Sequence, residues 1–199
     1  LLPALAAVAV GSVFKKSLTD MLVSLGNYMP PPGRMRLLRG VKETLIIDDT
    51  YNSSPAAASA ALEALAFIGP HFSSAKKRRG RRIAVVGDML ELGRHSVEEH
   101  RKLGAVAAKN ATLLLTVGFR ARDIAEGALD HKMKDTAILQ YEEAEKAGDE
   151  LEALIRPGDT ILVKGSQGMR LERVVEMLMA NPEKAPELLV RQDEEWKKR

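Results

Sequence analysis

Polar side chains that could bind a charged ligand follow three apolar, strand-like runs of this 199-residue sequence. They are Asp48, Asp49, Tyr51 and Asn52 after the first run, Asp88 and Glu91 after the second, and Lys164 and Ser166 at the end of the last. A lysine and a hydroxyl suit phosphate or carboxylate oxygens, whereas an aspartate at a strand end suits ribose hydroxyls or a hydrated magnesium ion. If the strands are parallel, their carboxyl ends share one edge of the sheet, and these groups converge on one crevice.

Each of these residue types also has a plainer structural use. An acidic residue after a strand often caps the next helix or a turn, and this alternative stays open for Asp48 and Asp88. The glycines of GDMLELG (87–93) and KGSQG (164–168) could serve tight turns alone. A lysine at the buried end of a strand, such as Lys164, is harder to explain without a partner or a ligand for its charge. The histidines are scattered without metal-ligand spacing, so we expect no metal site in this chain.

The elements that must position these side chains alternate between strands and helices. Apolar and β-branched runs predict strands at 43–47, 81–86, 112–117, 136–140 and 160–164. Helices are predicted between and after them: one that starts at Ser54 and Pro55, one opened by Ser96 with Glu99 as a capping box, and others at 122–129, 142–155 and 169–179. This order predicts an α/β fold with a mainly parallel sheet and right-handed crossovers.

The residues ahead of the first predicted strand have a different character. The run LLPALAAVAVGSVF (1–14) is shorter than the roughly 20 apolar residues of a membrane span, and it lacks the preceding positive region of a signal peptide. It is typical of a helix packed inside a domain whose earlier part is missing, so we expect the chain to be a fragment. Ser17 and Asp20 predict a short helix that ends at Gly26, and MPPPG (29–33) predicts a linker or rigid turn.

The composition excludes some classes of protein. With 30 Lys and Arg against 27 Asp and Glu and no cysteine, the chain has neither a disulfide framework nor thiolate metal sites, and a reducing cytoplasmic setting fits. The basic run KKRRGRR (76–82) is better explained as a solvated loop than as a nucleic-acid site, because no aromatic residues interleave it. The tail, with the only tryptophan, Trp196, could pack on the surface or bind a partner. We expect neither a nucleic-acid nor a membrane partner.

A phosphate-binding loop is missing from the sequence. No G-x-x-x-x-G-K-[ST] motif occurs, and no G-x-G-x-x-G either. The chain alone is therefore not expected to hold a nucleoside triphosphate tightly or to transfer a phosphoryl group unaided.

Six segments in order resemble the carboxyl-terminal part of the Mur ligase family. They are GRMRLL, IIDDTYNSSP, RRIAVVGDMLELG, SVEEHRKLG, LLLTVG and ILVKGSQGMRLERVVEML. The resemblance implies that residues 1–48 are the end of the central ATP-binding domain, 49–180 a Rossmann-like carboxyl-terminal ligase domain, and 181–199 a charged tail. The phosphate loop and the catalytic residues would then lie upstream of this chain.

The resemblance also implies a reaction and roles for the residues. Within the family, the segments are most similar to members that use ATP and Mg²⁺ to join D-alanyl-D-alanine to UDP-N-acetylmuramoyl-tripeptide through an acyl phosphate. Arg34, Asp49, Tyr51 and Asn52 would contact ATP, and Asp88, Glu91, Lys164 and Ser166 would receive the dipeptide. The protein would be a cytoplasmic monomer, inactive without the upstream domains.

Two departures and two alternatives accompany this interpretation. KGSQG has Gln167 where relatives commonly carry arginine, so Arg170 is a candidate to replace that contact, and NSSP varies from the more usual ANP. One alternative is another ligase of this type, specific for folylpolyglutamate or cyanophycin, although GDMLELG argues against it. The other is a receiver-like signalling domain with Asp88 as its phospho-acceptor, although receivers place no proline-rich linker ahead of their acidic pair.

Overall fold

The chain folds into two compact units, Leu1–Pro30 and Pro31–Arg199. The computed structural model describes residues 2–75 and 80–198. The first unit contains α1 (Leu2–Val13) and α2 (Leu18–Gly26). The Ser17 hydroxyl accepts a hydrogen bond from the Asp20 amide at 3.1 Å, which confirms the predicted start of α2.

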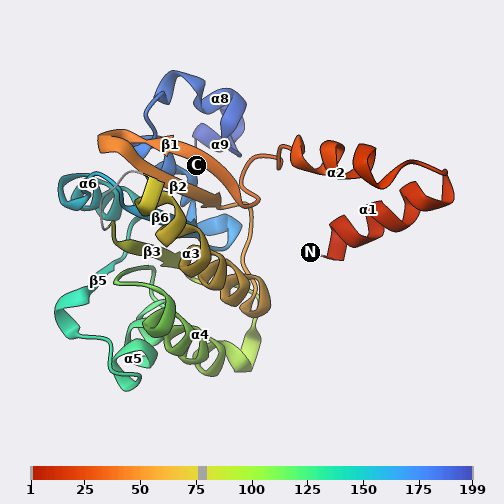
Figure 1. Cartoon of the computed structure of the whole chain (residues 1–199). Helices are drawn as coiled ribbons and strands as arrows, with labels where there is room; N and C mark the ends of the chain where they lie inside the picture. Colours follow the sequence, from red (N-terminus) through yellow and green to blue (C-terminus); the bar gives the residue numbers. More distant parts are fainter. Residues whose placement is uncertain (1, 76–79, 199) are drawn as a thin grey trace. The chain divides into compact units, whose positions relative to one another are not determined.

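The second unit is built on a six-stranded sheet in the order β1-β2-β6-β3-β4-β5 (Figure 1). The strands are β1 (Arg36–Gly40), β2 (Thr44–Asp49), β3 (Arg82–Gly87), β4 (Leu113–Val117), β5 (Ile138–Tyr141) and β6 (Thr160–Lys164). Only β1, at one edge, runs antiparallel, and it pairs with β2. The predicted α/β fold with a mainly parallel sheet is confirmed, and β1 is an addition that the sequence patterns did not predict.

Helices cover both faces of this sheet. The long ones are α3 (Pro55–Ala75), α4 (Ser96–Asn110), α5 (Arg122–Asp130), α6 (Ala144–Leu154) and α7 (Glu172–Leu178), and the short ones near the end are α8 (Ala185–Leu188) and α9 (Glu194–Lys197). Single 3₁₀ turns lie at Val41–Glu43, Gly93–His95, Asp135–Ala137, Gln167–Met169 and Pro182–Lys184. One core joins the sheet to α3, α4 and α5, and the other joins it to α6, α7 and α8. Among the described residues, no helix is both long and apolar enough to cross a membrane.

The alternation of side chains along β2 and β6 decides which polar groups meet. Ile47 and Leu162 belong to the core beneath α3, so Asp49 and Lys164, each two residues further along its strand, point to that same face. Asp49 is also the register partner of Lys164 across the parallel pair of β2 and β6. Asp48 is turned to the opposite face.

Some predicted details differ from the structure. The capping box at Ser96 and Glu99 is wrong, because a 3₁₀ turn at Gly93–His95 runs directly into α4, and Ser96 becomes the first helical residue. His95 then occupies the cap position and makes no side-chain cap hydrogen bond. The last long helix begins at Glu172 rather than at residue 169, because Arg170 adopts the left-handed conformation with a φ of 53°.

The two charged segments behave in different ways. Residues 76–79 of the basic run lie outside the described part of the chain, whereas Arg81 forms an ion pair of 2.7 Å with the buried Asp159. In the tail, Ala185 and Leu189 are buried in the core beside α7, so the start of this segment packs on the sheet domain. The domain boundary expected after residue 48 falls inside β2, whereas the two compact units meet between Pro30 and Pro31.

Candidate functional site

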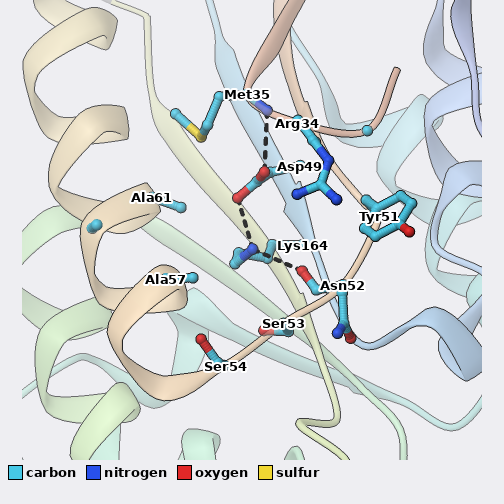
Figure 2. A pocket seen from close by; sticks show the side chains of 12 residues that line it. Arg34, Met35, Asp49, Tyr51, Asn52, Ser53, Ser54, Ala57, Ala61 and Lys164 are labelled. Carbon is cyan, nitrogen blue, oxygen red and sulfur yellow. Dashed lines mark hydrogen bonds and ion pairs between the residues drawn. The ribbon is translucent and has the colours of Figure 1, made fainter. Parts of the chain in front are cut away.

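A cavity of about 530 Å³ opens at the carboxyl ends of β2 and β6, next to the amino-terminal end of α3 (Figure 2). Its lining consists of Gly33, Arg34, Met35, Asp49, Tyr51, Asn52, Ser53, Ser54, Ala57, Ala60, Ala61 and Lys164. All four residues predicted to contact ATP are in this set, together with one of the four predicted to receive the dipeptide. We refer to this cavity as the α3 pocket.

An ion pair between Asp49 and Lys164 forms the floor of the α3 pocket. The lysine ammonium lies 2.7 Å from Asp49 Oδ2 and donates a second hydrogen bond to the Asn52 carbonyl at 2.9 Å (Figure 2). Asp49 Oδ1 accepts a hydrogen bond from the Met35 amide at 3.1 Å. The side chains are only 3% exposed for Lys164 and 13% for Asp49, so each charge depends on the other for its stabilisation. Asp49 keeps lone pairs that a ligand hydroxyl could use.

The neighbouring Asp48 has a structural role. It is fully buried, and it accepts hydrogen bonds from the Gly33 amide at 3.0 Å and from the Thr50 amide and hydroxyl at 3.2 Å and 2.6 Å. Burial raises the pKa of Asp48 even though these hydrogen bonds favour its charged form. Gly33 must be glycine here, because its φ is +68° and an added Cβ would lie 2.9 Å from the Tyr51 nitrogen. Asp48 thus fixes the turn that carries Arg34.

Arg34 and Tyr51 form the outer wall of the α3 pocket. The guanidinium carbon of Arg34 lies 4.0 Å from the centroid of the Tyr51 ring, and both side chains are exposed (Figure 2). A stacked guanidinium and aromatic ring offer a flat surface to a planar base and a positive charge to an anion. The same two side chains also line a second recess of about 470 Å³, which we call the tail recess. Leu189, Val190, Arg191, Asp193 and Trp196 contribute to its lining.

The remaining predicted residues gather at the end of β3, outside the α3 pocket. Asp88 Oδ1 accepts a hydrogen bond from the Ala121 amide at 2.7 Å, and Arg120 lies 3.6 Å from Asp88 Oδ2. The Ser166 amide donates to the Asp88 carbonyl at 3.0 Å, and the Ser166 hydroxyl accepts from the Leu90 amide at 2.8 Å. Glu91 is exposed on the same loop, with a φ of 65°. The structure therefore brings Asp88 and Ser166 together, and it brings Lys164 to Asp49 instead.

Sequence reasoning did not select Ser53, which lines the α3 pocket just ahead of α3. Its hydroxyl oxygen is buried and has no hydrogen-bond partner within the described part of the chain, and the residue is 8% exposed. The amino-terminal end of a helix carries partial positive charge, so this corner of the pocket favours an anionic oxygen. The pattern of Ser54 and Pro55 marked the helix start, but nothing in the sequence singled out the preceding serine.

The described residues form no cluster of side chains that could bind a metal ion. Residues 2–75 and 80–198 contain no group of three or more His, Asp or Glu side chains placed to hold a metal ion. At the α3 pocket, Asp49 is engaged by an ammonium group, and Asp88, the residue that a receiver domain would phosphorylate, is buried at 4% exposure and hydrogen-bonded to the Ala121 amide.

Comparison of the sequence with known proteins gives a consistent result. Residues 33–167 match the family described as "Mur ligase, glutamate ligase domain". The chain is 32% identical over 180 residues to the UDP-N-acetylmuramoyl-tripeptide--D-alanyl-D-alanine ligase of Bacillus subtilis, covering 90% of this chain and 37% of that protein. It is 32% identical over 183 residues to the Escherichia coli protein of the same name, covering 89% and 36%. The chain thus spans little more than a third of the length of these relatives.

Solved structures point to the same group of proteins. The MurF ligase of Thermotoga maritima in complex with ADP superposes with a TM-score of 0.66 and 30% identity, covering 89% of this chain and 37% of that one. A MurF structure from Acinetobacter baumannii gives a TM-score of 0.68 and 29% identity over 86% of this chain and 36% of that one. Neither the receiver alternative nor the folylpolyglutamate and cyanophycin alternatives are favoured by these similarities.

Proposed function

The chain belongs to the Mur ligase family, and from this premise we propose that it supplies the nucleotide-facing carboxyl-terminal domain of an ATP-dependent peptide ligase. The reaction proposed for the whole ligase joins D-alanyl-D-alanine to UDP-N-acetylmuramoyl-tripeptide, the two compounds in the names of the relatives. That reaction belongs to the assembly of peptidoglycan precursors. We propose that the ligase is a monomer and that it acts in the cytoplasm.

The observation that carries this proposal is the α3 pocket. Asp49, Tyr51, Asn52 and Arg34, the four residues that the sequence assigns to ATP, line one cavity of about 530 Å³. That volume lies within the range of roughly 300 to 1,000 Å³ that is usual for pockets holding small molecules and cofactors. A structural neighbour in the same family is in complex with ADP, which supports a nucleotide as the ligand.

Each side chain has a distinct task in this proposal. Asp49 accepts hydrogen bonds from the ribose hydroxyls, and Lys164 holds that carboxylate in place through the 2.7 Å contact. Arg34 reaches the phosphates, with Tyr51 holding its guanidinium plane. The Ser53 hydroxyl and the amino-terminal end of α3 receive an anionic oxygen at the far side of the pocket.

In the proposed chemistry, the peptide carboxylate attacks the terminal phosphorus of ATP and forms an acyl phosphate, with ADP leaving. The dipeptide amine then attacks the acyl carbon, the bond to the phosphate oxygen breaks, and inorganic phosphate leaves as the amide forms. We assign Mg²⁺ and the catalytic residues to parts of the ligase outside this chain. The chain alone is expected to be inactive.

The dipeptide surface is proposed at the end of β3. Glu91, exposed on its loop, suits the ammonium group, and Asp88 and Ser166 shape that loop through the hydrogen bonds described above. The contact with Asp49 supports assigning Lys164 to the nucleotide side instead. The division of the chain into two compact units supports placing the end of the central domain between Pro30 and Pro31 instead of at residue 48. The buried Leu189 supports including the start of the tail in the ligase domain.

Calorimetric titration of the 199-residue chain with ADP tests the nucleotide assignment. We expect measurable binding that Asp49→Asn weakens by about tenfold, the effect of losing a hydrogen bond to a charged group. Asp88→Asn is the matched control and should leave the affinity unchanged, because Asp88 lies outside the α3 pocket. Absence of ADP binding, or equal losses in the two variants, would contradict the proposal.

A further inference from the structure

We propose that Arg191, in the tail, is a positioning residue for the α3 pocket: it holds the backbone of residues 50–51, and through Tyr51 it sets the position of Arg34. This inference rests on the proposed nucleotide site and adds to it a segment of the chain that neither the family match, which ends at residue 167, nor the sequence patterns assigned.

Arg191 is bound on two sides. Its Nη1 donates a hydrogen bond of 2.9 Å to Glu172 Oε2 on α7 and one of 3.1 Å to the Thr50 carbonyl, and its Nη2 donates to the Tyr51 carbonyl. The Arg191 side chain is 5% exposed and that of Glu172 is 1% exposed. A planar guanidinium can serve a carboxylate and two carbonyls at once because its donors form a rigid fork. The three acceptors are thereby fixed relative to one another.

Glu172 in turn is shared with a second arginine. Its Oε1 accepts from Arg170 Nε at 2.5 Å, and Arg170 Nη1 donates to the Trp196 carbonyl at 2.7 Å. The guanidinium carbons of Arg170 and Arg191 lie 5.3 Å and 5.6 Å from the centroid of the Trp196 ring. Arg170, which the sequence offered as a ligand contact, is therefore engaged with Glu172 and with the tail.

The tail also packs against the turn that carries Arg34. A Cβ added at Gly33 would meet the side-chain atom Val190 Cγ1 at 3.0 Å and the Tyr51 backbone nitrogen at 2.9 Å, so the Val190 side chain packs closely against this turn. The Tyr51 amide donates to the Gly33 carbonyl at 3.0 Å. Glu172, Arg191, Tyr51 and Arg34 thus form a connected series that ends at the outer wall of the α3 pocket.

The positions of Glu172 and Arg191 explain how they can affect nucleotide binding without contacting the nucleotide. Glu172 lies on α7, which packs on the face of the sheet opposite α3. Arg191 lines the tail recess and does not line the α3 pocket, whereas Arg34 and Tyr51 line both. The wall between the two cavities is therefore supported from behind by the tail.

The test uses Arg191→Ala and Arg191→Lys, with Arg81→Ala as the matched control. Arg81 also joins a buried carboxylate, Asp159 at 2.7 Å, to a backbone carbonyl, that of Leu154, but it lines neither cavity. Amide hydrogen exchange of residues 50–52, compared with β4, is measured without ligand, and ADP affinity and urea stability are measured on the same proteins.

Arg191→Ala is expected to speed exchange at residues 50–52 by about tenfold or more, beyond any change in β4, and to raise the dissociation constant for ADP by about tenfold. Arg191→Lys should recover stability better than affinity, because a single ammonium group cannot span all three acceptors. Arg81→Ala should lower stability and leave both pocket measurements unchanged.

The possible failures are distinguishable. If Arg191→Ala leaves exchange at residues 50–52 no faster than in β4, or changes affinity only as much as Arg81→Ala does, the positioning role is overturned. If the unaltered chain binds no ADP, the proposed nucleotide site fails, and the exchange measurement still decides whether Arg191 holds residues 50–51. If Asp49→Asn weakens ADP binding and Arg191→Ala does not, the nucleotide site stands and the inference falls.

Discussion

The ends of β2 and β3 look alike in sequence and differ in structure. Each strand ends near an aspartate, Asp49 or Asp88, and the central strand β6 lies between them. Asp49 meets a buried ammonium group from β6 and faces a cavity. Asp88 accepts a hydrogen bond from the Ala121 amide at the start of α5, and it lines neither the α3 pocket nor the tail recess.

The difference shows what makes a strand-end carboxylate available to a ligand. At Asp49, the neighbouring strand supplies a cation, and the carboxylate retains open lone pairs toward the pocket. At Asp88, the loop after β4 turns back at Gly118, with a φ of 108°, and brings a helix amide to the carboxylate. Whether each aspartate is available to a ligand thus depends on the strand or helix that packs beside it, and not on the residues next to it in the sequence.

The largest expected effect is at the ion pair. Lys164→Ala leaves Asp49 mostly buried without its cation and should lower the free energy of unfolding by about 3 kcal/mol, as expected for a broken buried pair. Urea denaturation measures it. The double variant with Asp49→Asn should recover part of the loss, because no unpaired charge then remains. A double variant no more stable than Lys164→Ala would show that the two groups are not coupled.

A smaller effect is expected at the other strand end. In Gly118→Ala the new Cβ would lie 2.5 Å from Asp88 Oδ1 at a positive φ, which should cost about 2 kcal/mol of stability. Gly93→Ala is the matched control, since Gly93 has a φ of +53° but nothing within 4 Å of the added atom. Thermal or urea unfolding of both variants measures what the crowding by Asp88 Oδ1 and by Met169 Cε at 2.6 Å, together with the larger φ of 108°, adds to the strain at Gly93. Equal losses would mean that crowding at Asp88 adds nothing.

Asp88→Ala removes the hydrogen-bond acceptor of the Ala121 amide. We expect a loss of about 1 kcal/mol in unfolding free energy, the usual effect of removing a helix cap, with ADP affinity unchanged. In Asp49→Asn, by contrast, ADP affinity should fall by about tenfold, and stability should fall as well because Lys164 is left buried without its carboxylate. A strong loss of ADP affinity in Asp88→Ala would remove the distinction drawn between the two strand ends.

The smallest effect concerns Asp48, a buried carboxylate turned away from Lys164. Because burial raises its pKa above the ordinary value of 3.8, the folded chain holds a proton there more tightly than the unfolded chain does. This contribution to stability is complete below pH 3.8 and is lost as the pH rises through the folded-state pKa. The unfolding free energy of the unaltered chain, relative to that of Asp48→Asn, should therefore fall as the pH rises. A relative stability that increases with pH would contradict this account.

The sequence predicted the alternating strands and helices because their apolar runs are long and their breakers are strong. It did not predict β1, a five-residue edge strand in which Leu38 is the only buried large side chain and two arginines interrupt the apolar pattern. The capping box at Ser96 failed because the preceding 3₁₀ turn continues directly into the helix. Local sequence patterns therefore predict an element correctly only where its structure does not depend on the element next to it.

The candidate site shows the same division. The sequence patterns mark both Asp49 and Lys164 as functional residues, but they assign the two residues to different ligands. Their pairing follows from β6 lying beside β2, across 115 positions of sequence, and strand order cannot be read from either segment alone. Arg191 was missed for a similar reason, since its partners Glu172 and Thr50 meet it only after the tail has folded back.

The order of the strands has a consequence for how the chain is made. β6 is the last strand to be synthesised, yet it lies between β2 and β3. Until residues 160–164 are available, the sheet can exist only as two separate parts, each with an unpaired edge exposed. Joining them requires contacts between distant parts of the chain, which form late and slowly. A nascent chain that stops before β6 therefore lacks both the centre of its sheet and the buried cation of the α3 pocket.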